Sequence, residues 1–160
     1  MYRHDERRHE RRFNNRRWVT KRYVNFSNVL GHFWLRDGAK HREGGLPAYE
    51  GVNGEKEWYI NGNCHRDNDK PAQERANGDK EWYVRGERHR EEVNGPAVVL
   101  MNGYKSWYSH GKLHRSNNLP AIERPNGENE WWVNGVKELK EEVDRRKQLS
   151  DMLKNKVVSE

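Results

Sequence analysis

Hydrophobic and polar residues alternate over short segments of this chain, and the segments recur at a fixed interval. In residues 55–60 (EKEWYI), alternation places Trp58 on one face and Tyr59 on the other. A period of two is typical of a β-strand whose two faces differ. Gly54 and Gly62 bound the segment, so we expect one strand here between two turns.

The alternating segment belongs to a repeat with a period of 24 or 25 residues. The recurring tryptophans are Trp34, Trp58, Trp82, Trp107 and Trp131, and the recurring histidines are His41, His65, His89 and His114. Proline and Asn-Gly recur at the same interval, and the single extra residue lies within 91–95 (EEVNG). This regularity predicts a stack of similar units, each in contact with its neighbours.

Each unit carries two turn signals and one proline. The Asn-Gly pairs, of which 53–54 is the first, have the composition of a hairpin turn in which both residues adopt positive φ. A second turn follows the aromatic pair, as at 61–62, and Pro71 should break the path that returns to the next unit. We therefore predict a hairpin and a connecting loop per unit, with units about 10 Å apart.

The two ends of the chain differ from the repeats. Residues 1–17 are a basic arm, which would align Arg8, Arg12 and Arg16 if it were helical. Residues 18–32 are rich in β-branched and aromatic types, which predicts one or two strands that form a degenerate cap. Residues 136–160 place apolar residues three and four positions apart, which predicts an amphipathic helix that either covers the last repeat or pairs with a partner helix.

The predicted fold class is therefore mainly β. We expect an elongated antiparallel sheet of hairpin repeats over residues 18–135, with about four repeats of 24 residues from position 33. A C-terminal α-helix and a basic N-terminal arm flank this array.

Composition supports a thin core. Charged residues make up 35% of the 160 residues, while seven Trp and seven Tyr supply large contact areas. A repeat array suits this balance because its core lies between neighbouring units. The net charge of +6 belongs to the arm, since residues 1–22 hold nine Lys or Arg and three Asp or Glu, whereas the remainder holds 22 of each.

Several classes of protein are disfavoured. Cys64 is the only cysteine, which excludes an internal disulfide framework and fits a reducing, intracellular compartment. The N-terminus has no apolar segment typical of a secretory signal, and no apolar run approaches the length of a transmembrane helix. We find no nucleophile elbow, zinc-protease or phosphate-loop motif and expect no catalytic residue.

The repeated histidines invite a metal site, but their spacing disfavours one. Equivalent side chains in successive units would lie roughly 10 Å apart, whereas a zinc ion needs nitrogen ligands within about 2.1 Å. We expect no metal and no cofactor, and we interpret the histidines and the recurring tryptophans as a structural ladder. The arginine after each histidine could lie over a tryptophan ring as a cation–π partner; these are Arg42, Arg66, Arg90 and Arg115.

Two sets of residues are candidates for partner binding. The first is the arginines of the arm, which suit an acidic surface: Arg3, Arg7, Arg8, Arg11, Arg12, Arg16 and Arg17. The second is an aromatic row that should be partly exposed and could stack bases or sugars: Tyr59, Tyr83, Tyr108 and Trp132.

The segments WYINGNCHR, KPA and ANG, with WYVRGERHR, GPA and WYSHGKLHR, resemble the MORN-repeat variant family. More narrowly, they look like the W-Y-x-N-G-x-x-H-R-x4-P-A form common in large nucleocytoplasmic DNA viruses. The resemblance covers residues 33–135. It implies β-hairpin repeats used for protein or lipid contact and for scaffolding, and a bacterial branch looks like antitoxin-type proteins.

These observations predict a non-enzymatic structural or interaction protein. We expect a minor capsid or virion-associated protein that bridges larger subunits, with capsid proteins as partners, located in a virion assembled in the host cytoplasm. One alternative is a nucleic-acid-binding protein that uses the arm, residues 1–17, and the aromatic row. A further alternative is an antitoxin-like protein.

Overall fold

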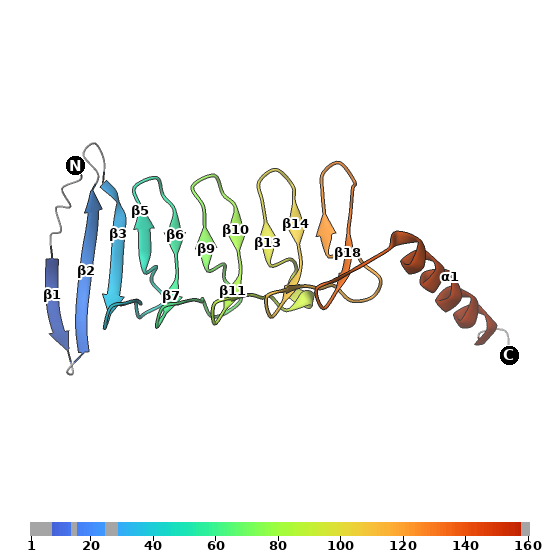
Figure 1. Cartoon of the computed structure of the whole chain (residues 1–160), viewed down its shortest axis with the longest axis horizontal. Helices are drawn as coiled ribbons and strands as arrows, with labels where there is room; N and C mark the ends of the chain where they lie inside the picture. Colours follow the sequence, from blue (N-terminus) through green and yellow to red (C-terminus); the bar gives the residue numbers. More distant parts are fainter. Residues whose placement is uncertain (1–7, 14–15, 25–28, 158–160) are drawn as a thin grey trace.

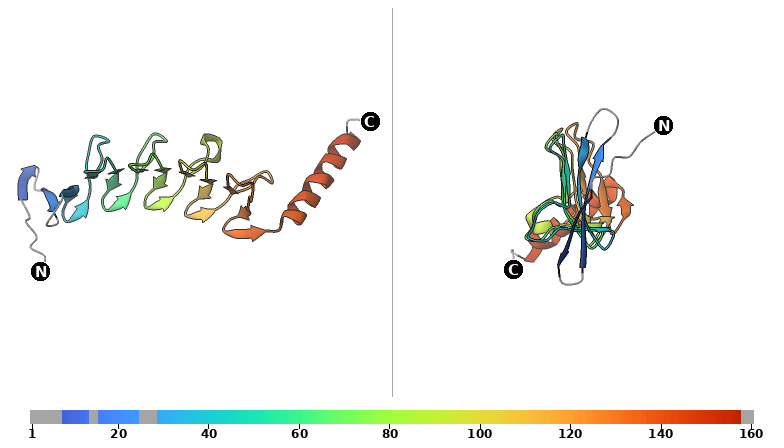
Figure 2. Two further views of the ribbon diagram at one scale, coloured as in Figure 1. Left: turned by 90° about the horizontal axis from the view of Figure 1, so that it is seen from above. Right: turned by 90° about the vertical axis from the view of Figure 1, so that its left-hand side faces the viewer.

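The computed structural model describes residues 8–13, 16–24 and 29–157, with side chains from 31 to 154, and its architecture is mainly β. A long antiparallel sheet of hairpin strands runs along the molecule and a C-terminal helix follows it (Figure 1). Viewed along the long axis, the repeated units lie nearly one behind another (Figure 2). The predicted fold class is confirmed.

The main sheet gains two short strands with each unit. Its strands, in spatial order, are β1 (Arg8–Phe13), β2 (Arg16–Val24), β3 (Val29–Arg36), β5 (Tyr49–Gly51), β6 (Lys56–Glu57), β9 (Gln73–Glu74), β10 (Lys80–Glu81), β13 (Val98–Val99), β14 (Lys105–Ser106) and β17 (Ile122–Glu123). The short strand β4 (Ala39–Lys40) pairs with β3, and Ile122 forms a bridge to Glu130. Because spatial order follows chain order, every unit contacts the units before and after it.

A second row of small hairpins runs beside the main sheet. They are β7 (Tyr59–Ile60) with β8 (Asn63–Cys64), β11 (Tyr83–Val84) with β12 (Glu87–Arg88), β15 (Tyr108–Ser109) with β16 (Lys112–Leu113), and β18 (Trp131–Val133) with β19 (Val136–Glu138). Successive hairpins are joined where a turn glycine donates to the preceding hairpin, as from Gly62 to the Lys40 carbonyl at 2.8 Å and from Gly86 to the Cys64 carbonyl at 2.8 Å.

The prediction of one continuous strand over 55–60 is wrong, because the chain changes partner at Trp58. The Trp58 amide donates to the Ala72 carbonyl in the main sheet at 2.8 Å, while the Trp58 carbonyl accepts from the His65 amide at 3.0 Å. The same exchange occurs at Trp34, Trp82 and Trp107. The tryptophan is therefore the point at which each unit passes from the main sheet to its small hairpin.

The prediction that both residues of each Asn-Gly pair adopt positive φ is also wrong. Gly54 has φ 92°, whereas Asn53 stays at negative φ. The Gly54 amide donates to the Gly51 carbonyl at 3.0 Å, and the Asn53 side chain accepts from the Glu55 amide at 3.0 Å. This is a type I turn followed by a glycine bulge, in which asparagine supplies a side-chain acceptor rather than a left-handed backbone.

Positive φ at both central residues occurs instead in the second turn of each unit. Asn61 has φ 50° and Gly62 has φ 82°. Arg85 (φ 53°) and His110 (φ 47°) occupy the same left-handed position, although side chains with a Cβ rarely adopt it unless they are Asn or Asp.

The return loops contain the predicted break at proline, and three of them share a backbone form. Residues 44–45, 68–69 and 117–118 are consecutive left-handed pairs, made by Gly-Gly, Asn-Asp and Asn-Asn. In the remaining loop, which holds the extra residue, a short 3-10 helix η1 (Glu92–Asn94) takes their place. The insertion is thus absorbed outside the sheet.

The core is thin and repetitive. Its centre is the alanine of each Pro-Ala pair, fully buried in all four units: Ala48, Ala72, Ala97 and Ala121. Trp58, Trp82 and Trp107 are each less than a tenth exposed. Burial between units rather than in one central cluster is the arrangement expected for a repeat array.

The described part of the predicted arm, residues 8–13 and 16–17, lies in strands. Strands β1 and β2 form a hairpin, with Arg12 opposite Arg17, and β2 pairs with β3. This agrees with the strands predicted for residues 18–32 but shows no helix in the described part of the arm.

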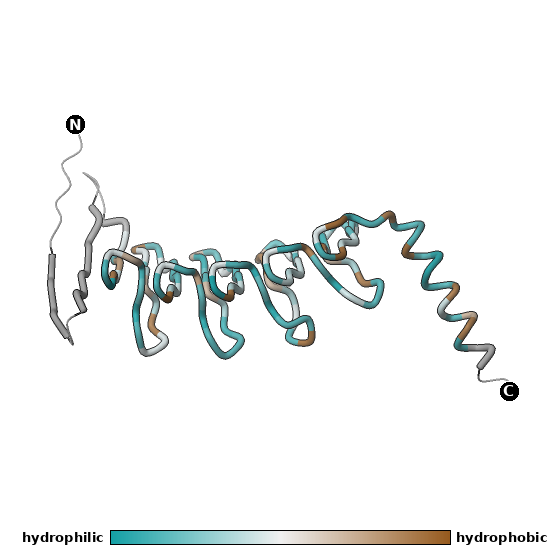
Figure 3. Tube along the Cα trace, turned by 60° about the horizontal axis from the view of Figure 1, so that its bottom comes forward, coloured by the Kyte–Doolittle hydropathy of each residue, from teal (hydrophilic) through white to brown (hydrophobic). Residues whose placement is uncertain are grey.

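Helix α1 (Lys140–Val157) does not cover the last repeat along its length. Val143 is fully buried, whereas Leu149, Met152 and Leu153 are more than half exposed. The helix leaves the array at an angle, with hydrophobic positions recurring along it (Figure 3). Within the described residues, no helix combines the length and the apolar character needed to cross a membrane.

The left-handed turns yield a prediction about stability. Replacing Arg85 with Asn should raise the free energy of unfolding by about 0.5–1 kcal/mol, because Asn tolerates positive φ better. The matched change Asn61→Ala should lower it by about 1 kcal/mol at the equivalent position. Urea unfolding followed by tryptophan fluorescence measures both, and equal effects of the two changes would contradict the turn assignment.

Candidate functional site

One side of the array carries a row of arginine–tryptophan stacks. The guanidinium carbon lies 3.5 Å from the ring centre in the Arg66–Trp58 and Arg115–Trp107 pairs. It lies 3.7 Å from that centre for Arg42 over Trp34 and 4.1 Å for Arg90 over Trp82. The predicted cation–π contacts are therefore confirmed in all four units.

Each of these arginines also binds the return loop that follows it. Arg66 donates to the Pro71 carbonyl at 3.0 Å and to Glu74 at 2.9 Å. Arg42 and Arg115 make the equivalent pairs of bonds. The arginine thus joins tryptophan, loop and sheet, and its charge is already compensated.

Each ladder histidine links its unit to the next. The Nδ1 atom of His41 accepts from the Asn61 amide at 3.0 Å. His65, His89 and His114 accept in the same way from the amide that opens the next second turn, at 3.2–3.3 Å. An imidazole that accepts at Nδ1 must be neutral and carry its proton on Nε2.

The second ring nitrogen of three histidines faces a local acceptor. Nε2 lies 2.9 Å from Asp67 for His65, 3.3 Å from Glu91 for His89 and 3.3 Å from the Ser116 hydroxyl for His114. Both nitrogens of these rings are therefore engaged. Among the side chains that the structure describes, no group of three or more His, Cys, Asp or Glu is arranged to hold a metal ion.

The indole nitrogens tie the tryptophans to the preceding return loop. Trp58, Trp82 and Trp131 donate to the second residue of each left-handed pair, namely to the carbonyls of Gly45, Asp69 and Asn118, at 2.9–3.2 Å. Trp107 makes no such bond within the described chain, because η1 replaces the pair in its loop. The ends of the ladder, Trp34 and Trp131, are partly exposed.

Open hollows lie between successive return loops. Their volumes are about 540 Å³ beside Trp58, 320 Å³ beside Trp82 and 200 Å³ beside Trp107. Each is lined by a tryptophan, by the tyrosine that follows it, by the His-Arg pair of one unit and by the histidine of the next unit. The repetition of one lining suits contact with an extended partner more than enclosure of one small molecule.

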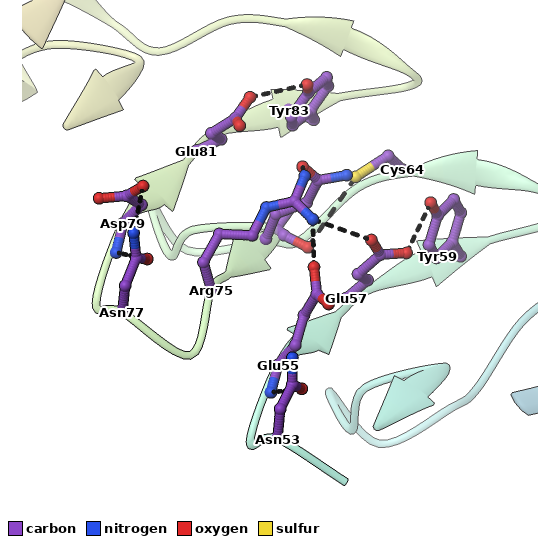
Figure 4. Close-up of polar contacts among 12 residues, drawn as sticks. Asn53, Glu55, Glu57, Tyr59, Cys64, Arg75, Asn77, Asp79, Glu81 and Tyr83 are labelled. Atoms are coloured by element: carbon purple, nitrogen blue, oxygen red, sulfur yellow. Dashed lines mark hydrogen bonds and ion pairs between the residues drawn. The ribbon is translucent and has the colours of Figure 1, made fainter. Parts of the chain in front are cut away.

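The aromatic row lies on the other side of the sheet and is half-buried. The hydroxyl of Tyr59 donates to Glu57 and that of Tyr83 donates to Glu81, both at 2.9 Å (Figure 4). Trp132 donates to Glu130 at 2.9 Å. The polar atoms of these three side chains are thus used internally, which leaves ring edges for a partner.

Cations sit between these aromatic rings. Lys40 lies 4.5 Å from the Tyr59 ring centre, and Arg88 lies 5.6 Å from both Tyr83 and Tyr108. Arg88 also binds Glu81 at 2.9 Å. Arg75 joins Glu55 in the same region (Figure 4). This face is held together by charge-assisted bonds as well as by apolar contact.

The same packing shifts several pKa values. Burial, with the carboxylates of Glu57 and Glu81 nearby, raises the pKa of the Cys64 thiol to about 12. Burial and the bond to Glu81 raise the pKa of Tyr83 to about 12, and burial beside Glu57 raises that of Tyr59 further. Hydrogen bonds from Arg124, Trp132 and Lys137 lower the pKa of Glu130 to about 2.

Five of the seven arginines of the predicted arm lie within the described residues. Arg3 and Arg7 lie outside the described residues. Arg8, Arg11 and Arg12 fall on β1, and Arg16 and Arg17 fall on β2. The five described positions are therefore brought together in one hairpin at the end of the sheet.

One hairpin differs from the others in a way that spacing alone did not single out. Residues 97–106 read AVVLMNGYKS, whereas residues 72–81 in the preceding unit read AQERANGDKE. Met101 at its tip is 69% exposed. The difference lies at positions whose residue varies between units. Comparing those positions, and not only the ones that recur, would have identified this hairpin from the sequence.

Comparisons with protein-family models, with curated proteins and with solved structures found no match to this chain.

The histidine ladder can be tested with an isosteric replacement. Asparagine places Oδ1 near the position of the imidazole Nδ1 and can accept the same amide. Changing all four histidines to Asn should largely keep stability, whereas changing them to Leu should remove about 1 kcal/mol per unit.

Urea unfolding at pH 7.5, followed by tryptophan fluorescence, provides the measurement. Equal stability of the Asn and Leu variants at neutral pH would contradict the acceptor role.

Cys64 provides an alkaline test. At pH 8 a thiol with a pKa of about 12 holds roughly a thousandfold less thiolate than one with the ordinary value of 9. Reaction with a disulfide reagent should be correspondingly slow in the folded chain and fast in urea.

The same shift affects stability. Because the folded pKa values of Cys64, Tyr59 and Tyr83 lie above the unfolded ones, the unfolded chain ionises first as pH rises from about 9. These three groups should therefore lower the free energy of unfolding as pH rises from about 9 toward 12, and they should have no effect on it at neutral pH. In the reaction with the disulfide reagent, a folded Cys64 thiol that reacts as fast as free cysteine would contradict its burial.

Proposed function

We propose that this chain is a non-enzymatic interaction protein that bridges larger subunits of an assembly. The observation that carries the proposal is the repeated bonding between units. The histidine-to-amide and glycine-to-carbonyl bonds recur along the array and hold the units in one line. A stiff strip of this kind can keep two attachment points at a set distance.

The two ends offer different attachment points. At one end, helix α1 presents Leu149, Met152 and Leu153 to solvent. At the other, five arginine positions share the β1–β2 hairpin. An apolar helix face suits a protein partner, while clustered arginine positions suit an acidic one.

The distribution of polar groups supports a role in contact rather than catalysis. The ladder histidines and arginines are engaged by backbone and carboxylate groups within the array. The hollows repeat one lining instead of converging on a single set of reactive groups. An active site generally needs such convergence.

The finer proposal is a minor capsid or virion-associated protein of a large DNA virus, with capsid proteins as its partners. It rests on the similarity of the repeat to the motif W-Y-x-N-G-x-x-H-R, the form of the MORN-variant repeat common in large DNA viruses. The strip form of the repeat array supports this bridging role.

Quantitative mass spectrometry of purified particles tests the proposal. The chain should be present in a fixed ratio to the major subunit, and its absence at such a ratio would overturn the virion role. Within that system, Leu149→Glu with Leu153→Glu should reduce incorporation severalfold by placing charge on the apolar helix face. The exposed change Gln148→Glu on the same helix is the matched control and should incorporate normally.

A further inference from the structure

The hairpin of residues 97–106 breaks the charge pattern of the array on one face of the main sheet. Strand register places equivalent residues side by side across the sheet. That row reads Glu50, Lys56, Glu74, Lys80, Val99, Lys105, Glu123. Val99 stands where the alternation of acid and base calls for an acid.

The missing carboxylate leaves positive charge around Val99. In the other units the ladder arginine binds the glutamate of this row, as Arg66 binds Glu74. Arg90 has no such glutamate and binds Asp69 of the preceding loop, at 2.7 Å. Lys80 and Lys105 flank Val99 in this row and are exposed. Like Lys56 in the regular part of the row, neither forms an ion pair within the described chain, so the change in net charge comes from the lost glutamate itself.

Exposed apolar side chains occur in the same unit. Met101 is 69% exposed and lies across Gly78 of the preceding tip, at 3.0 Å from where a Cβ would stand. Val93 on η1 is 92% exposed, and it belongs to the return loop of this unit. Return loops lie on this face of the sheet, because Arg66 reaches Glu74 from one of them.

A sheet row that lacks an expected acid, in a unit that also exposes apolar side chains at its tip and in its return loop, breaks a local rule at a cost in stability, and such places tend to be functional. We propose that Val99, Met101, Lys80 and Lys105 form a docking surface for an acidic amphipathic helix of a partner protein. This inference rests on the proposed function, since it names the chemistry of a partner for the array.

Charge and spacing determine the partner's form. Lys80 and Lys105 are two strand steps apart, which is about 9.6 Å. Carboxylates seven residues apart on one helix face are about 10.5 Å apart, and apolar residues three and four positions along the helix fall between them. On an extended segment, same-face residues recur at about 6.6 Å and 13 Å, so a helix is the better match.

The probe is a helical peptide of about 20 residues built on Ala and Gln, with two Glu seven residues apart and two Leu between them. Fluorescence anisotropy of the labelled peptide should show saturable binding to the full chain that weakens with salt. The same peptide with Lys in place of Glu should not bind.

Three single changes locate the surface. Val99→Glu should weaken binding at least about tenfold, because it sets a carboxylate against the acidic helix. It should leave thermal stability equal or higher, since the new carboxylate restores the acid that Lys80 and Lys105 flank in the row. Lys80→Ala should weaken binding about two- to fivefold. Lys56→Ala, at the equivalent position two units before Lys105, is the matched control and should bind as wild type.

The outcomes separate this inference from the proposed function. Failure of the wild-type chain to bind the acidic peptide, unchanged binding by Val99→Glu, or equal losses from Lys56→Ala and Lys80→Ala would each overturn the docking surface. Normal incorporation of Val99→Glu into particles would also contradict it while leaving the bridging role intact. Peptide binding by a chain that is absent from particles would contradict the virion role alone.

Discussion

The structure depends on the backbone of one recurring tryptophan. Its amide belongs to the main sheet and its carbonyl to the small hairpin, so each unit is shared between two rows of hydrogen bonds. The indole ring is stacked against the arginine of its own unit in four units, and at Trp58 and Trp82 the indole nitrogen also donates to a carbonyl of the preceding loop. A residue with less surface would leave this junction poorly packed, because alanine is the only hydrophobic residue buried in all four units.

Charged residues are part of the packing around the recurring tryptophan and do not only face solvent. A guanidinium over the tryptophan ring supplies contact area and bonds to loop and sheet at once. On the opposite face, tyrosine hydroxyls, carboxylates and cations form a layer in which desolvation and pairing shift several pKa values. This explains how a chain with 35% charged residues folds with so few buried aliphatic side chains.

The period, the hairpins and the break at proline could be predicted because Trp, Pro and Gly impose local geometry wherever they stand. The strand split at Trp58 could not, because alternation continues through it while the hydrogen-bond partner changes. Asn-Gly indicated a turn but not its type, since asparagine can act through its side chain as well as its backbone. Side-chain roles were harder: the His65 ring faces an amide 20 residues away, and no local pattern reveals that pairing.

The row of glycine-to-carbonyl bonds between small hairpins has a mechanical consequence. A lone sheet rotates by roughly 20–25° from strand to strand, which would carry equivalent residues around the axis over a few units. A second line of bonds, running parallel to the first and offset from it, opposes that rotation, and the units remain nearly in line (Figure 2). Equivalent residues of successive units therefore lie close to one straight line. A straight ligand could contact the same position in every unit without winding around the array.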